Sequence, residues 1–201
     1  MTTRRPRGDQ QLVQIVDSAL ADATRRSGSW LKCKSGCTQC CVGVFPISQL
    51  DAARLRYGLE QLEVDDPKRA ARIRKRLKSI RGGLLRGFPG DAETKVLDES
   101  EDAQEVFDEY ANDVACPVLD PKTGKCDLYE WRPITCRAFG PPIRTEDGLG
   151  VCELCFEGAS AEEIASCEMK VDPDGVEAKL LKGLEKRTGR SGRTIVAFAF
   201  E

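Results

Sequence analysis

The sequence contains no histidine at all. Histidine is the commonest general base in catalysis and the usual nitrogen ligand of zinc. Its absence excludes Cys2His2 zinc fingers, HExxH sites, iron sites built from two histidines and a carboxylate, and Ser-His-Asp triads. Any metal bound by this chain would therefore be held by sulfur, with or without oxygen.

Long apolar segments and a large net charge are also missing. The longest apolar run is "IVAFAF" near the C-terminus, so we expect no membrane helix and no membrane partner. The basic start "MTTRRPRGDQ" is not followed by an apolar stretch, which argues against a secretory signal. The net charge of −2 argues against a general attraction to nucleic acid. We expect a cytoplasmic protein.

Cysteine, in contrast, is abundant, with ten in 201 residues. Disulfide scaffolds are usually short, secreted and richer still in cysteine. In a reducing compartment thiols stay reduced, and clustered thiols there most often bind metal, with redox disulfides as the alternative. Thiolates select soft ions, so zinc, iron (as an ion or an iron–sulfur cluster) and Cu(I) are the candidates.

The N-terminal third is expected to be helical on both sides of the first cysteines. Residues 9–26 have apolar side chains at helical spacing, and Asp9 can serve as the N-cap. Ser48, with Asp51 three residues later, predicts a capping box at the start of a second helix. Gly58 is predicted to end that helix.

Residues 65–113 separate two cysteine-rich segments and are predicted to be an inserted helical pair. The first helix begins near Pro67, ends at a Gly-Gly pair and is strongly basic, whereas the second, at about 100–112, is acidic. The basic helix alone would suit nucleic acid or an anionic surface. A solvated face partly neutralised by the acidic helix is the favoured interpretation. We expect this pair to stand off the metal core.

The remaining segments predict short elements. "CPVLDPKTGKC" (residues 116–126) has a central turn signal and predicts a hairpin. Ser160 and Glu163 form a capping box, residues 174–187 predict a helix ended at Gly189, and "RTIVAFAF" predicts a terminal strand. The expected fold is therefore α+β and mostly helical, with short strands around a small cysteine-rich metal core. We expect one domain over residues 1–201.

The spacing of the cysteines is the main indication of chemistry. C-x3-C and C-x2-C lie in the range of metal-ligand pairs, because two thiolates must reach one ion at about 2.3 Å. The candidate ligands are Cys33, Cys37, Cys40, Cys41, Cys116, Cys126, Cys136, Cys152 and Cys155. We expect the cysteines at 33, 37, 40, 116, 126 and 136 to converge in the fold.

Cys41 and Cys167 each have an alternative to metal binding. The adjacent Cys40 and Cys41 point to opposite sides in extended chain, so they suit two centres, or one centre and the core. Cys167 stands alone on an expected helix and is interpreted as a buried free thiol.

The segment 33–40 also has the C-x3-C-x2-C spacing of radical S-adenosylmethionine enzymes. Those enzymes need a barrel long enough to surround their cofactor, and little chain precedes the insertion here. The downstream cysteines would have no role in such an enzyme. This alternative is therefore not favoured.

The ordered string of motifs resembles another family. "CKSGCTQCC" (33–41) is followed by Cys-Pro-Val-Leu (116–119), Cys-Asp-Leu-Tyr (126–129) and "RPITCRAF" (132–139). This order resembles the YkgJ-type cysteine-cluster family, a zinc- or iron-chelating domain that is locally similar to flagellin lysine N-methylases. The resemblance covers residues 33–45 and 115–140 and implies metal binding without implying a reaction.

Arg132 and Arg137 flank Cys136 and could offset the negative charge of a thiolate site, although a surface position or an Arg–carboxylate pair is the alternative. We therefore expect a metal-binding protein organised by zinc or iron. An iron–sulfur enzyme for redox or methyl transfer, and a zinc-organised module that binds nucleic acid or protein, are the alternatives.

Overall fold

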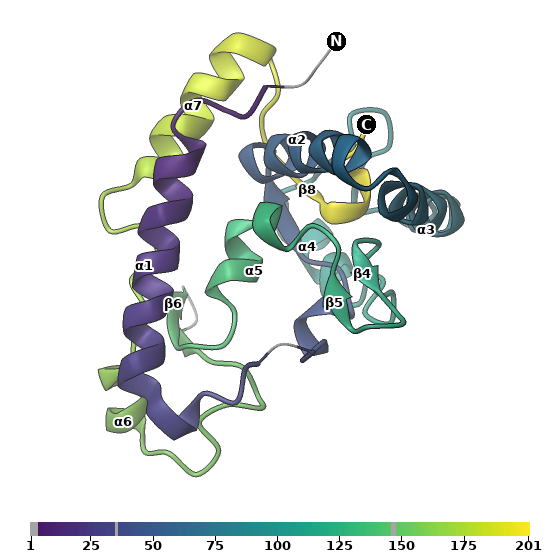
Figure 1. Ribbon diagram of the computed structural model, residues 1–201. Helices are drawn as coiled ribbons and strands as arrows, with labels where there is room; N and C mark the ends of the chain where they lie inside the picture. The colour runs from purple at the N-terminus through teal and green to yellow at the C-terminus, as the bar shows by residue number, and fades with distance from the viewer. Residues whose placement is uncertain (1–3, 35, 146–147) are drawn as a thin grey trace.

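The computed structural model describes residues 4–34, 36–145 and 148–201. These residues form seven α-helices and short strand pairs, so the fold is α+β and mostly helical, as predicted (Figure 1). The helices are α1 (Asp9–Ser27), α2 (Gln49–Asp65), α3 (Pro67–Leu85), α4 (Glu101–Asp108), α5 (Ile134–Ala138), α6 (Ala161–Ser166) and α7 (Val176–Thr188). No helix in the described residues is both long and apolar enough to cross a bilayer.

Helix α1 runs along one side of the molecule and packs against α5 and α7 (Figure 1). Its apolar face is buried as predicted, with Leu12 and Val16 fully inaccessible. The predicted N-cap role of Asp9 is wrong: Gly8 occupies the cap position, and no side chain caps the helix. The Asp9 carboxylate is instead buried against Arg54 of α2, at 2.5 Å. A buried ion pair between two helices has replaced the local cap.

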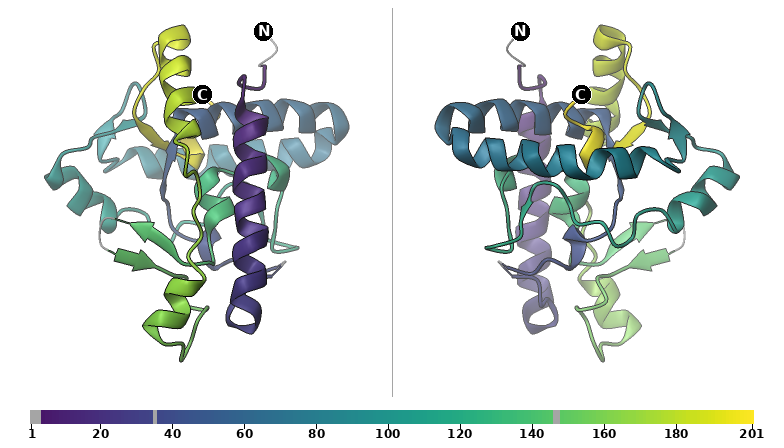
Figure 2. Two further views of the ribbon diagram at one scale, coloured as in Figure 1. Left: turned by 90° about the vertical axis from the view of Figure 1, so that its left-hand side faces the viewer. Right: turned by 90° about the vertical axis from the view of Figure 1, so that its right-hand side faces the viewer.

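Helices α2 and α3 lie side by side and are joined by a single residue, Asp66 (Figure 2). The capping box of Ser48 and Asp51 is present at the start of α2. The prediction that Gly58 ends this helix is wrong, because α2 continues to Asp65. A Cβ atom at Gly58 would lie 2.2 Å from Cγ of Trp131, so this glycine serves close packing rather than helix termination.

Helix α3 is part of the core and does not stand off it. Its apolar stripe, Ala70, Ile73 and Leu77, packs in the same buried cluster as Leu55 and Leu59 of α2. Its main neighbour is α2, and only its C-terminal end packs near the acidic helix α4, through Leu84 and Phe107. It continues through the Gly-Gly pair to Leu85. The expectation of a basic–acidic pair away from the core is therefore corrected: the apolar stripe is buried more effectively against α2.

The strands of the described residues form four two-stranded antiparallel sheets. They pair β1 (Pro46–Ser48) with β8 (Arg193–Ile195), β2 (Gly90–Asp91) with β3 (Val96–Leu97), β4 (Leu119–Asp120) with β5 (Lys125–Cys126), and β6 (Ile143–Thr145) with β7 (Gly148–Gly150). The β4–β5 pair confirms the predicted hairpin. The predicted terminal strand is formed only as β8, and a 3₁₀ turn at Val196–Phe198 follows it.

Two predicted caps in the C-terminal part are confirmed. Ser160 and Glu163 form the capping box of α6. Helix α7 ends at Gly189, whose left-handed conformation (φ 69°) closes the last turn.

Candidate metal centre

The two cysteine-rich segments lie side by side although they are far apart in the sequence. The backbone N–H of Cys116 donates to the carbonyl of Cys41 at 2.8 Å, and Gly43 N–H donates to Val114 at 3.0 Å. An antiparallel bridge joins Val42 to Ala115 between these bonds. The end of the first cysteine loop is therefore held against the start of the second.

Four cysteines gather around the β4–β5 hairpin, and we call Cys40, Cys116, Cys126 and Cys136 the hairpin cluster. They come from a 3₁₀ turn (Gln39–Cys41), the chain before β4, strand β5 and helix α5. Removal from water raises the pKa of Cys136 well above its ordinary value, and the neighbouring thiols at 116, 126 and 40 raise it further. Burial, with Cys126 and Cys40 adding to it, raises the pKa of Cys116 to about 12. These four thiols are thus near enough to repel one another when ionised.

A second group lies on irregular chain, and we call Cys33, Cys37, Cys152 and Cys155 the loop cluster. Burial is the largest cause of the raised pKa of Cys33, and repulsion from Cys37, Cys40, Cys155 and Cys152 raises it further. Burial also raises the pKa of Cys152, and the thiols of Cys155 and Cys37 contribute. Since Cys40 acts on Cys33 as well as on the hairpin cluster, the two groups are neighbours.

Gly140 brings the chain that follows α5 close to the loop cluster. Its φ of 117° is a conformation that residues with a side chain rarely adopt. A Cβ atom there would also lie 3.4 Å from Cβ of Cys33 and 3.2 Å from a methyl group of Leu31. Glycine at this position therefore permits the approach between the two clusters.

A buried polar network that sequence reasoning missed holds the helix that carries Cys136. Asp51 accepts the backbone N–H of Ile134, the first residue of α5, at 3.0 Å. Arg54 pairs with both Asp51 and Asp9, and its guanidinium also donates to the carbonyl of Arg132 at 3.3 Å. The network thus fixes α5 relative to α2. The capping box at Asp51 and the expected cap at Asp9 were sequence signals near it, but neither indicated the pairing with Arg54.

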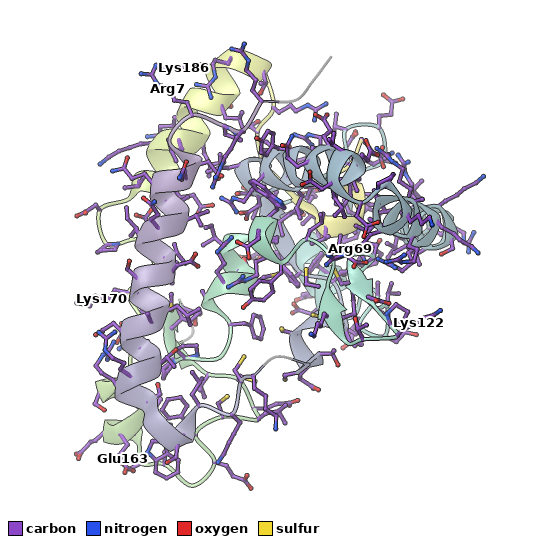
Figure 3. The ribbon with its side chains drawn as sticks, viewed as in Figure 1. Arg7, Arg69, Lys122, Glu163, Lys170 and Lys186 are labelled. Atoms are coloured by element: carbon purple, nitrogen blue, oxygen red, sulfur yellow. The ribbon has the colours of Figure 1, made fainter. Side chains whose placement is uncertain are left out.

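A second missed residue, Asp127, adjoins Cys126. Its carboxylate is buried and accepts from Arg69 and Arg76 of α3, each at 2.5 Å. Figure 3 shows Arg69 between α3 and the β4–β5 hairpin. Arg76 also donates to the carbonyl of Pro117 at 2.7 Å. Two arginines of the basic helix therefore anchor the hairpin that carries Cys126, and this pairing could have been suspected from the acid-free stretch of α3.

The two arginines beside Cys136 have different surroundings. Arg137 is buried and pairs with Asp17 of α1 at 2.7 Å. It therefore forms the Arg–carboxylate pair that was the alternative to a role beside the thiolates. Arg132 stacks over the ring of Tyr129 at 3.9 Å. Its charge lowers the pKa of both Cys40 and Cys126, opposing larger effects that raise it. Arg132 is therefore a positive neighbour of the hairpin cluster, whereas Arg137 joins helices.

Two cysteines fall outside the two groups of four. The thiol of Cys41 is hydrogen-bonded to that of Cys40, and this bond is the largest cause of the raised pKa of Cys40. Cys167 is buried in a small apolar cluster with Cys155 and Phe156, and its sulfur lies 3.7 Å from the hydroxyl of Ser166.

The donor chemistry of the clusters fits a soft metal, but the sulfur atoms of the described residues are not arranged around a common metal position. In residues 4–34, 36–145 and 148–201, no group of three or more Cys, Asp or Glu side chains is arranged to hold a metal ion. All the cysteines there are free thiols, and a metal would have to displace their protons and draw the sulfurs together. Figure 3 shows sulfur atoms on the loops beneath α5 and beside β5, where such a movement would occur.

Comparison with known proteins agrees with this chemistry. Residues 32–155, which include both clusters, match the family model CxxCxxCC, described as "Putative zinc- or iron-chelating domain". A search of the curated proteins gave no match, and a search of the solved structures gave none either. Since the matched residues make up more than half of the sequence, this chain belongs to the CxxCxxCC family of zinc- or iron-chelating domains.

Proposed function

We propose that this protein binds zinc or iron through cysteine thiolates at two adjacent centres. The hairpin cluster would supply one set of four ligands and the loop cluster the other. The observation that carries the proposal is that eight thiols lie in two neighbouring groups, one around the β4–β5 hairpin and one on the loops, with Cys40 acting on members of both. Four thiolates complete a tetrahedral zinc site and equally a cubane iron–sulfur cluster.

The remaining residues are assigned around these centres. Cys41 would be a hydrogen-bonding neighbour of Cys40 rather than a fifth ligand, and Cys167 a buried free thiol. Arg132 would offset part of the negative charge of the hairpin centre, and Arg137 would hold α5 against α1. The whole chain would act as one domain, with residues 65–113 inserted in sequence but packed into its core. Its ten cysteines suit a reducing compartment such as the cytoplasm.

Metal content measured on matched variants tests the two-centre proposal. The protein is purified anaerobically, and zinc and iron per chain are measured by elemental analysis. Cys136→Ser should remove the metal of the hairpin centre only, and Cys37→Ser that of the loop centre only, so each should keep about half of the metal. The double variant should keep none, and Cys167→Ser should keep all of it.

Two results would contradict the proposal. If either single variant lost all the metal while remaining folded by circular dichroism, the eight cysteines would share one centre. If both variants kept the full content, the cysteines would not be the ligands.

A redox iron–sulfur centre is the second candidate, and the surface of the clusters favours it. Cys33 is exposed, and the large apolar side chains of Val42, Phe139 and Leu154 beside the clusters are exposed as well. Exposed apolar side chains beside an accessible centre suit contact with an electron-transfer partner, because the buried part of a protein interface is more apolar than its rim. A brown protein whose visible absorption bleaches reversibly with dithionite would support this candidate, and a colourless protein with stoichiometric zinc would exclude it.

A further inference from the structure

A large cleft lies between α2, the β2–β3 hairpin and β8, and none of the described cysteines lines it. Its volume is about 1270 Å³. Apolar side chains form part of its wall, among them Phe88, Val96 and Phe198. A cleft of this size, lined by both polar and apolar side chains, can accommodate a small organic molecule.

The cleft contains an arginine without a counter-charge. The guanidinium of Arg56, on α2, donates to the carbonyl of Ala199 at 2.6 Å. In the described residues it forms no ion pair with a carboxylate, and a second arginine, Arg190, lies close enough to repel it. Burial and this repulsion lower the pKa of Arg56 to about 10, so it is still charged at neutral pH. A partly buried, uncompensated charge of this kind is costly unless an anion binds beside it.

A hydroxyl group in the same wall also lacks a partner. Thr194, on β8, is 3% exposed and lines the cleft. Its Oγ1 is the only buried side-chain nitrogen or oxygen of the described residues that has no hydrogen-bond partner. Buried polar groups are nearly always satisfied, so this isolated exception, in the wall of the cleft that also contains Arg56, leaves a donor that a ligand could satisfy.

The acidic residues of the cleft do not neutralise Arg56. The carboxylate of Asp91 accepts from the backbone of Glu93 and Thr94 in its own turn. Glu201 pairs with Arg81 of α3. The other acids that line the cleft are exposed to solvent: Glu93, Asp98 and Asp102.

We infer that this cleft binds a small organic anion, with a carboxylate or phosphate head between Arg56 and Arg190. The unsatisfied hydroxyl of Thr194 lies beneath the wall of the cleft and would donate to the head once the side chains over it shift. The apolar part of the ligand would lie against Phe88 and Val96. This site is separate from the cysteine clusters and does not depend on the metal proposed for them.

Titration calorimetry at low salt with three probes that share one ring tests the inference. The probes are phenylphosphate, phenylacetate and the neutral phenylacetamide, added to the full-length protein as purified. At least one anion should bind saturably and the amide should not, and the preferred anion distinguishes a phosphate head from a carboxylate. Since a hydrogen bond to a charged group contributes about 1.5–3 kcal/mol, Arg56→Gln and Arg190→Gln should each weaken the anion about tenfold or more.

Two further variants separate binding from folding. Arg74→Gln removes an exposed arginine that pairs with Glu63 away from the cleft, and it should leave the affinity unchanged. Thr194→Val should weaken the anion severalfold while leaving the melting temperature equal or higher, because it deletes an unsatisfied buried hydroxyl. Arg190 is exposed, so its variant should fold even if the Arg56 variant does not. No saturable anion binding, equal binding of the amide, or binding unaffected by both cleft arginines would overturn the inference.

Discussion

The two cysteine clusters have the same chemistry but rest on different supports. The hairpin cluster lies against the buried side chains of α2 and α3, and Cys116 and Cys126 pack on that core directly. The loop cluster lies on irregular chain next to short α6, where the buried apolar cluster consists of Cys155, Phe156 and Cys167. Four thiols can therefore be brought together either by an apolar scaffold or by loops that have little burial of their own.

The difference has a thermodynamic consequence. Ordering each residue costs about 1–2 kcal/mol of conformational entropy, which the α2–α3 core can offset by burial. The loops around Cys33 and Cys152 bury little, so their order must depend on the bound metal if they are ligands. The comparison thus predicts a stable scaffold and a metal-dependent region in one chain.

Metal removal should have the largest effect. A structural zinc contributes on the order of 10 kcal/mol at neutral pH, so a strong chelator should disorder the loop cluster. Hydrogen exchange followed by mass spectrometry should show fast exchange at residues 28–41 and 150–168, while α2 and α3 stay protected. If α2 and α3 lost protection together with the loops, the two regions would be one cooperative unit and the comparison would fail.

Asp127→Asn should weaken the scaffold. The change leaves Arg69 and Arg76 without their shared buried carboxylate, and breaking such a pair costs about 2–3 kcal/mol when the arginines are partly exposed. Urea unfolding of the chelated protein measures the loss. The control is Asp22→Asn, which removes an exposed pair with Arg25 and Arg26 and should cost less than about 1 kcal/mol. Equal losses for the two variants would mean that Asp127 does not anchor the hairpin.

Gly58→Ala should destabilise the scaffold by about 1–3 kcal/mol, because the added methyl group would overlap Trp131. The matched control is Gly82→Ala in α3, where a Cβ atom meets no neighbouring atom within 4 Å. That change should stabilise the protein by about 0.5–1 kcal/mol through helix propensity. Thermal melting of both variants gives opposite signs if the packing is correct, and a stabilising Gly58→Ala would refute the contact.

Tyr110→Phe should have the smallest effect, about 1 kcal/mol, because it removes the hydrogen bond from the phenol to the carbonyl of Leu84. Burial raises the pKa of Tyr110 from 10 to about 12. Above pH 10 the unfolded chain therefore binds fewer protons than the folded chain. The stability that the neutral phenol provides is fully present below pH 10 and is lost as the pH rises through about 12. Unfolding free energies measured from pH 9 to 12 should decline less steeply for the variant. Parallel curves would show that Tyr110 is not buried as a neutral group.

Local patterns predicted much of the secondary structure and the class of site. The capping boxes at Ser48 and Ser160, the 116–126 hairpin and the end of α7 at Gly189 depend on neighbours within a few residues, so the sequence was sufficient for them. The ordered cysteine motifs likewise indicated the chelating family that the comparison found.

Several positions were misjudged because distant residues decided them. Gly58 looks like a helix end until Trp131 is placed against it, and Asp9 looks like a cap until Arg54 is buried beside it. The basic helix looks like a solvated appendage until its stripe meets α2 and two of its arginines reach Asp127. In each case close packing of a side chain, or the pairing of a buried charge with an opposite one, outweighed the local preference.

By itself, then, the sequence determined the kind of chemistry, since ten cysteines and no histidine leave thiolate as the metal donor. It also determined most helix starts, because caps are short-range interactions. Only the tertiary structure decided which thiols lie near one another and which residues, Arg56 and Thr194 among them, line one cleft. Such groupings join residues far apart in the chain, and packing and electrostatics bring them together only when the whole core has formed.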